Sequence, residues 1–332
     1  MKYLKQMLCV GICGVMLAAA TGCSGSLTGG KRIIRISHAQ SETHPEHLGL
    51  LKFKEYVEAN LGNKYEVQIF PNELLGSAQK AIELTQTGAI DFVVAGTANL
   101  ETFADVYEIF SMPYLFDSKA HAYAVLDGEI GQSLFDGLES QGMVGLTYME
   151  NGFRNVFSTK PITKPADLKG VKIRIMENQI QTATFSALNA IVTNMASGEV
   201  YTGLQQGTID AAENAICAYY SSAYYEVCKE LSLTEHFYGA TALLMSKKVF
   251  ASLTEEQQTI LKEAAAEARD LQRADVAERE TRYLDELQAE DGVTVHEDVD
   301  KDAFRAITDE IYPKFYDTIP QDLVESIRNC AY

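Results

Sequence analysis

Two arginines stand in the sequence where a charged side chain is unusual. Arg174 lies inside the apolar run Val-Lys-Ile-Arg-Ile-Met, and Arg154 follows Asn-Gly-Phe. A guanidinium group held on a rigid strand can bind a carboxylate through two parallel hydrogen bonds. Because the chain has a formal net charge of −18, a pocket for an anion needs placed arginines. The pattern predicts a carboxylate site; the alternative for Arg174 is an edge strand whose polar face it shares with Lys172.

The sequence motifs of catalysis are missing. The chain contains no Gly-x-Ser-x-Gly, no phosphate-binding glycine loop, no His-Glu-x-x-His and no Cys-x-x-Cys. A secreted hydrolase that uses Glu177 and Glu213 as paired carboxylates is the enzymatic alternative. Acidic pairs are common in a chain with 46 Asp and Glu residues, so a binding protein without catalysis and without a cofactor is predicted.

Two segments could be read as metal sites, and we predict that neither is one. The first contains Glu42, His44, Glu46 and His47 at an expected strand-to-helix junction, where helix capping or a ligand contact is the simpler interpretation. The second mimics the start of a calcium loop, but its sixth position is not glycine. A solvated acidic turn is therefore predicted at Asp298, Asp300, Asp302 and Ala303.

The first half of the chain predicts a strand–helix–strand–helix–strand order. Strands are expected over 32–37, 65–70 and 89–95, and a helix over 47–61. Ser77 can cap a second helix that runs to 87, and Gly88 suits its left-handed C-terminal position. Such βαβ units imply a parallel sheet with right-handed crossovers.

The second half repeats this plan. Strands are expected over 171–175, 190–195 and 208–211, with helices over 179–188 and 199–206, Ser197 as a candidate N-cap and Gly207 as a helix stop. The sequence Gln-x-Gly-x-Ile-Asp occurs in both halves, at 86–91 and at 205–210. Two copies in matching units indicate two similar α/β domains.

Residues 254–291 contain no glycine or proline and are rich in Ala, Glu, Gln and Arg. A helix of that length reaches roughly 50 Å at ~1.5 Å per residue, so it is expected to lie across both domains. Its apolar residues lack the sustained heptads of a coiled coil.

With 332 residues the chain is expected to form two domains. The first domain is expected to contain residues 32–150 plus about 237–280, and the second 151–236 plus about 281–332.

The net charge excludes two classes of partner. Nucleic acid and anionic lipid both require a basic face, which a strongly acidic chain does not supply.

The first 23 residues combine Lys2 and Lys5 with a short apolar run and end in Ala-Thr-Gly-Cys, as in an export signal. Cys23 resembles the lipidated cysteine of a bacterial lipobox; the alternative is a plain signal peptide cut nearby. A linker is expected over 24–31.

Three cysteines follow the leader, namely Cys217, Cys228 and Cys330. An exported chain meets oxidising conditions, so one disulfide is compatible with the sequence. An odd number leaves at least one thiol unpaired.

Several longer segments occur together and in order: FPNELLGSAQKAIELTQTGAIDFVVAGT, SMPYLF, KPITKPADLKGVKIRIME, GEVYTGLQQGTIDAAENA and YYEVCKELSLTEH. They resemble the solute-binding proteins of tripartite ATP-independent periplasmic (TRAP) transporters, of the DctP type. The resemblance covers about residues 34–287. It implies a two-domain, periplasmic-binding-protein-like clamp, each domain a mixed sheet flanked by helices, with a long helix spanning both.

The resemblance also implies the residues of the site. Arg174 would form the salt bridge to a ligand carboxylate, and Arg154 with Asn214 would complete the anchor. The remaining expected contacts come from both halves of the chain and are His44, Gln79, Thr97, Asn151 and Tyr219.

The ligand implied by the resemblance is an organic acid, and the segment after Arg174 is most similar to members that bind sugar acids such as uronates and aldonates. Two features depart from the family pattern. Asn194 and Ser197 stand where a proline and an aromatic ring are common, and the charged residue that usually follows Leu-Gly-Ser is absent. These changes suggest a ligand of different shape, bulkier or more anionic. A C4-dicarboxylate or another carboxylate is the alternative.

The implied partner is a membrane permease driven by an ion gradient. The protein is expected outside the cytoplasm as a monomer, anchored to the membrane by its lipid. A ligand sensor for a membrane signalling partner would have the same fold and is the second alternative.

Overall fold

The computed structural model of the chain describes residues 30–289 and 292–332. The predicted leader, its lipidation site Cys23 and most of the linker lie outside these residues. Within them, no helix combines the length and the apolar character needed to cross a membrane.

The centre of the molecule is a mixed sheet of nine described strands in the order β2-β1-β3-β8-β4-β7-β5-β6, with β9 paired to β8. β1 pairs in parallel with β2 and β3, and β5 pairs in parallel with β6 and β7. β8 and β4 run antiparallel to their neighbours β3 and β7 and to each other. The strands are β1 (Arg32–Ser37), β2 (Tyr65–Phe70), β3 (Phe92–Gly96), β4 (Met143–Ser158), β5 (Lys172–Ile175), β6 (Ile191–Asn194), β7 (Ala211–Ala215), β8 (Glu230–Ser246) and β9 (Thr294–His296).

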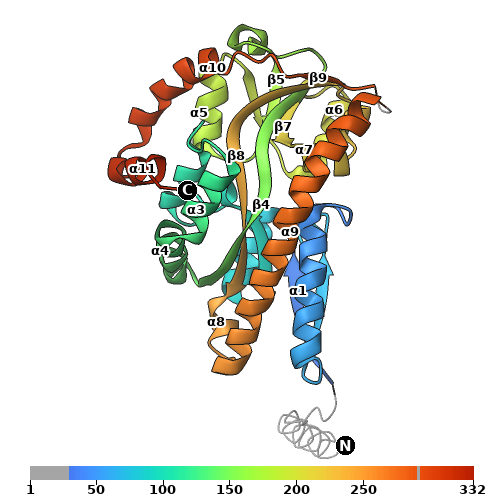
Figure 1. Ribbon diagram of the computed structural model, residues 1–332, viewed down its shortest axis with the longest axis vertical. Coiled ribbons are helices and arrows are strands. Elements are labelled where there is room, and N and C mark those ends of the chain that lie inside the picture. Colours follow the sequence, from blue (N-terminus) through green and yellow to red (C-terminus); the bar gives the residue numbers. More distant parts are fainter. Residues whose placement is uncertain (1–29, 290–291) are drawn as a thin grey trace, which may run out of the picture.

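Helices cover the sheet around two lobes (Figure 1). The first lobe contains strands β1–β3 and the second contains β5–β7. The α-helices are α1 (Pro45–Leu61), α2 (Ala78–Thr87), α3 (Lys119–Asp127), α4 (Glu129–Leu138), α5 (Gln179–Ala187), α6 (Val200–Gln205), α7 (Ile216–Ser221), α8 (Lys247–Phe250), α9 (Glu255–Ala289), α10 (Lys301–Thr308) and α11 (Gln321–Arg328).

Three long elements connect the lobes: β4, β8 and α9, which run side by side along the molecule in Figure 1. The first half of α9 packs its alanines, Ala264, Ala265 and Ala268, into the core beneath α1 and the first-lobe strands. Its last turns place Leu287 in the core of the second lobe. The predicted α/β clamp with a spanning helix is confirmed.

The repeated Gln-x-Gly-x-Ile-Asp segments fold identically. Gly88 and Gly207 end α2 and α6 with φ of 76° and 68°, and the residue after each bonds back to a carbonyl of the helix. Asp91 accepts a hydrogen bond from the backbone N–H of Arg35 at 2.9 Å, and Asp210 accepts one from that of Lys172 at 3.0 Å. Each aspartate thus joins the turn to a neighbouring parallel strand, a role the pattern did not reveal.

Several predictions about local structure differ from the structure. The strand expected over 89–95 is β3, Phe92–Gly96, because Ala89 and Ile90 bond back to the end of α2. The strand expected over 208–211 is β7, Ala211–Ala215, because Thr208 and Ile209 are used by the helix-ending turn. Ser197 makes no capping hydrogen bond and opens a short 3-10 turn. β5 lies between β6 and β7, so the edge-strand alternative for Arg174 is wrong.

The C-terminal segment crosses back to the first lobe. Residues of α11 and of the turn before it, Tyr312, Ile319, Val324 and Ile327, share one apolar core with α3 and α4. The domain boundaries drawn from the sequence placed this segment in the second domain, and they stay a prediction.

We expect Gly207→Ala to lower the thermal unfolding midpoint. No atom lies within 4 Å of a Cβ added there, so the cost is the left-handed backbone alone, about 1–2 kcal/mol. Gly137→Ala is the matched control, because Gly137 is an exposed helical residue with equally open surroundings and alanine favours a helix by about 1 kcal/mol. Measured by differential scanning calorimetry, the two substitutions should shift the unfolding midpoint in opposite directions. Equal shifts would contradict the interpretation of Gly207.

Candidate functional site

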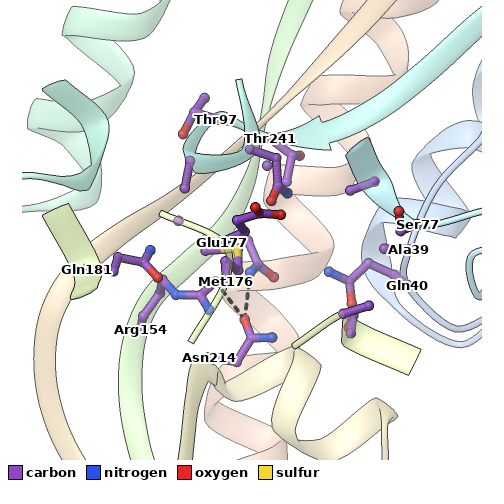
Figure 2. A pocket seen from close by; sticks show the side chains of 18 of the residues that line it. Ala39, Gln40, Ser77, Thr97, Arg154, Met176, Glu177, Gln181, Asn214 and Thr241 are labelled. Atoms are coloured by element: carbon purple, nitrogen blue, oxygen red, sulfur yellow. Dashed lines mark hydrogen bonds between the residues drawn. The ribbon is translucent and has the colours of Figure 1, made fainter. Parts of the chain in front are cut away.

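A cavity of about 400 Å³ lies between the two lobes. Its wall is built from the ends of β3, β5 and β7, the middle of β4 and β8, and the loops after β1 and β2. Figure 2 shows Arg154 and Asn214 on one side of it and Thr97 and Thr241 on the other. Such a position, at the carboxyl ends of parallel strands, is where α/β sheets bind ligands.

Arg174 supplies the main positive charge of the cavity. Its neighbours Ile173 and Ile175 point into the second-lobe core, so strand alternation turns the guanidinium to the other face. Nε and Nη2 donate to the Met195 carbonyl at 2.9 and 2.6 Å. No carboxylate of the described chain lies within ion-pair distance, although the side chain is only 4% exposed. Burial accordingly lowers the pKa of Arg174.

Arg154 is also buried, but its charge is already neutralised. Its guanidinium donates to both carboxylate oxygens of Glu213, at 2.5 and 2.7 Å, and to the backbone carbonyl of the same residue. Burial alone would raise the pKa of Glu213, but Arg154 and His236 outweigh it and hold the value at about 2. Arg154 is therefore fixed in place, and Arg174 remains the uncompensated cation.

Asn214 has a fixed orientation between these groups. Its Oδ1 accepts hydrogen bonds from Asn151 Nδ2 at 2.9 Å, Arg154 Nη1 at 3.0 Å and the Ala215 N–H at 2.9 Å. The side-chain amide nitrogen of Asn214 is consequently left to donate to a ligand, since no acceptor for it is found among the described residues. Asn151 Oδ1 is buried and accepts no hydrogen bond of normal geometry in the part of the chain that the structure describes, although the Asn151 side chain lies close to the buried ring of His44.

Six of the eight predicted binding residues line the cavity: Arg154, Arg174, Asn214, Asn151, Gln79 and Thr97. Gln79 accepts a hydrogen bond from Thr102 at 3.2 Å, which leaves its amide nitrogen available. Thr97 follows β3 and donates to the Ala240 carbonyl at 3.2 Å.

The structure places His44 and Tyr219 elsewhere. His44 is fully buried behind the cavity wall, where it caps α1 by accepting a hydrogen bond from the Glu46 N–H at 3.1 Å. Tyr219 is fully buried in the second-lobe core, where its ring packs at a tilt against Phe157 and its hydroxyl group donates to the Cys228 carbonyl at 2.5 Å. Both residues support the site from behind instead of lining it.

Sequence reasoning missed Glu46 and Thr241 as cavity residues. Glu46 was considered only as part of a segment with a possible capping or ligand role, and Thr241 stands in an apolar strand. A lone hydroxyl within such a run was the available signal for Thr241. Within residues 30–289 and 292–332, no group of three or more His, Cys, Asp or Glu side chains is placed to hold a metal ion.

The other polar motifs have structural roles. Asp300 caps α10 by accepting a hydrogen bond from the Ala303 N–H at 3.0 Å, in agreement with the predicted acidic turn. Cys217, Cys228 and Cys330 are all free thiols.

Two contacts join the lobes beside the cavity. Glu73 accepts a hydrogen bond from the Gly198 N–H at 3.0 Å. Deeper in the molecule, Glu101 accepts from Asn178 Nδ2 at 2.5 Å and from the Gln179 N–H at 2.8 Å, at the start of α5. Burial raises the pKa of Glu101 to about 8, and Glu108 and Glu177 add to the shift.

Residues 36–318 match the family described as bacterial extracellular solute-binding protein, family 7. The 2,3-diketo-L-gulonate-binding periplasmic protein YiaO of Escherichia coli is 35% identical over 298 residues, 89% of this chain and 90% of that protein.

Two solved structures share the fold. A TRAP periplasmic solute binding protein from Polaromonas bound to D-erythronate is 33% identical with a TM-score of 0.88, covering 91% of this chain and 100% of that one. One from Anaerococcus prevotii with bound D-glucuronate is 35% identical with a TM-score of 0.86, covering 90% and 97%.

Thermal stability should fall as the pH rises from 6 to 9, in part through Glu101. The pKa of Glu101 is about 8 in the folded protein against 4.5 as an ordinary value, so the folded state holds the proton more tightly. That contribution to stability is complete below pH 4.5 and is lost as the pH rises through about 8. Glu101→Gln should flatten the curve of melting temperature against pH.

The matched control for this measurement is Glu55→Gln, since the Glu55 side chain is 72% exposed. It should reproduce the wild-type slope. A Glu101→Gln curve parallel to wild type would contradict the assigned protonation.

Proposed function

The chain belongs to the family 7 bacterial extracellular solute-binding proteins of TRAP transporters, and we propose that its ligand is a sugar acid held by Arg174. The main support for this proposal is that the guanidinium of Arg174 is buried and has no ion-pair partner in the described chain. A buried cation without an ion-pair partner is costly, and a ligand carboxylate would remove that cost with two charge-assisted hydrogen bonds. Asn214 and Arg154 lie beside it and can donate to the same carboxylate.

The rest of the cavity supports a ligand rich in hydroxyl groups. Amide and hydroxyl groups of Gln79, Thr97, Gln181, Asn151 and Thr241 line it, and those of the last three include buried oxygen atoms that lack a partner within the described chain. The solved relatives hold D-erythronate and D-glucuronate, both polyhydroxy monocarboxylates. A C4-dicarboxylate, which needs two anion-binding ends, is less well matched because the only cavity-lining cations of the described chain are Arg154 and Arg174.

We infer further that the protein carries out no catalysis and delivers its ligand to a membrane permease. Glu213, one member of the paired carboxylates considered above, is bound on both oxygens by Arg154 and held ionised, so it cannot serve as a general acid. A role as a sensor for a signalling partner would use the same site.

Arg174→Ala should abolish measurable binding of D-glucuronate in isothermal titration calorimetry. Losing a buried charge-assisted anchor costs at least about 3 kcal/mol, or more than 100-fold in Kd. Arg174→Lys should recover only part of the affinity, because lysine lacks the planar fork. Lys172→Ala changes a half-exposed cation on the same strand and serves as the control with wild-type affinity. Unchanged binding by the Arg174→Ala protein would refute the anchor.

We propose that Cys23 is the lipid attachment site. It directly follows Ala-Thr-Gly at the end of the apolar leader segment. Cys23→Ser should move the protein from the membrane fraction to the soluble fraction of expressing cells, and mass spectrometry of the wild-type N-terminal peptide should show a diacylglycerol adduct. A wild-type N-terminus that is cleaved elsewhere and carries no lipid would favour the plain signal peptide.

A further inference from the structure

The first-lobe wall of the cavity contains a buried carboxyl group that the anchor does not use. Glu46 opens the first turn of α1, lines the cavity and is only 2% exposed. Its nearest potential ion-pair partner is His38, whose Nδ1 lies 3.5 Å from Oε1. Thr241 stands beside it on β8 but forms no hydrogen bond of normal geometry, since its Oγ1 is unpartnered in the described chain. Glu46 and Thr241 together define a distal subsite.

No lysine or arginine of the described chain forms an ion pair with Glu46; the nearest cation behind the subsite is Arg279, which donates to the Thr43 carbonyl at 3.2 Å. Burial lowers the pKa of both His38 and His44 to about 3, so both rings are neutral at physiological pH. His47, which shares a hydrogen bond with His38, also has its pKa lowered by burial. In these surroundings burial raises the pKa of Glu46 to about 8. The carboxyl group is therefore protonated at neutral pH and can both donate and accept a hydrogen bond.

Polar side chains of β4 and β8 lie along the cavity between the distal subsite and the anchor. On β8, Thr241 lies opposite Met149 and Phe237 lies opposite Arg154, so the two ends are separated by four strand residues, roughly 14 Å of backbone. Between them Asn151 packs over Gly239, where an added Cβ would meet the Asn151 Cβ at 3.2 Å. Arg154, Asn151 and Thr241 thus follow one another along the cavity. A ligand bound at the anchor can extend toward Glu46.

Building on the proposed sugar-acid function, we propose that Glu46 binds the uncharged, hydroxyl-bearing end of the ligand and selects sugar monocarboxylates over dicarboxylates of equal length. A hydroxyl group there exchanges hydrogen bonds with the neutral carboxyl and with Thr241. A second carboxylate would instead be buried beside an acid and neutral histidines, with no cation to compensate its charge. This argues against the more anionic ligand that the altered family pattern suggested.

Isothermal titration calorimetry at pH 7 with D-glucuronate and with D-glucarate, its six-carbon dicarboxylate counterpart, tests the selectivity. Wild type should prefer D-glucuronate by at least about tenfold. Glu46→Leu removes the hydrogen bonds of the carboxyl group and leaves Thr241 in place, and it should weaken the binding of D-glucuronate about 10- to 100-fold. Glu46→Gln keeps a donor and an acceptor and should stay within about threefold of wild type, while Glu55→Gln on the exposed face of α1 is the control.

A pH series separates a ligand contact from a merely structural role. Between pH 7 and 9.5 wild type should lose affinity for D-glucuronate as Glu46 ionises, and Glu46→Gln should not. Glu101 titrates in the same range but is present in both proteins, so the difference isolates Glu46. This comparison holds even where Glu46→Leu folds poorly.

The outcomes distinguish this inference from the proposed function. Wild type that binds no sugar acid would overturn both. A second outcome is that binding requires Arg174 but is unchanged by Glu46→Leu and follows the wild-type pH profile in Glu46→Gln. That outcome would support the proposed function and overturn the role of Glu46. Equal wild-type affinities for D-glucuronate and D-glucarate would overturn the selectivity.

Discussion

The organisation of the cavity depends on one costly feature, the buried guanidinium of Arg174 that no carboxylate of the described chain compensates. A cation in this position is tolerated because the Met195 carbonyl accepts hydrogen bonds from two of its N–H groups. The neighbouring Arg154 would double the unfavourable charge if it were also unpaired. Glu213 removes that problem by binding Arg154 on both carboxylate oxygens. Of the two guanidinium groups of the cavity, only that of Arg174 is left without a carboxylate partner in the described chain, which suits a ligand with one carboxylate.

The long connecting elements explain how a charge on one lobe can be coupled to contacts on the other. At the centre of β4, Glu150 has both its backbone groups bound by the side chain of Gln272 from α9. Two residues later the strand bulges at Gly152, which has φ of 103° and lies opposite Gly239 of β8. A side chain at Gly152 would meet the Glu280 carboxylate of α9 at 2.5 Å. The two strands are therefore braced by α9 on one side and bend at a glycine pair between the lobes.

The elements that could be predicted are those whose signals are local. The strand at 32–37, the Ser77 cap and the left-handed Gly88 follow from short-range geometry, and the doubled Gln-x-Gly-x-Ile-Asp marked two related units. Arg174 was identified because a charge inside a strand is locally anomalous. Tyr219 and His44 were misplaced because whether a side chain faces a cavity or lies behind its wall depends on packing between distant elements. Glu46 was misread for the same reason: only the approach of β8 to α1 makes it a cavity residue.

A ligand that spans the cavity would contact both lobes, and this couples binding to the relative position of the lobes. Its carboxylate would neutralise Arg174 on the second lobe, while its other end would reach the Glu46–Thr241 subsite of the first. Glu73 already accepts a hydrogen bond from Gly198 across the same cleft, and Glu101 bonds to the start of α5. A ligand shifts an equilibrium between a more open and a more closed arrangement of the lobes only by its difference in affinity for the two. A short acid that stops at Arg174 gives little difference, whereas one long enough to reach Glu46 gains its distal hydrogen bonds only when the lobes are close. In this scheme, a ligand that reaches from Arg174 to Glu46 would link its own length to the approach of the two lobes.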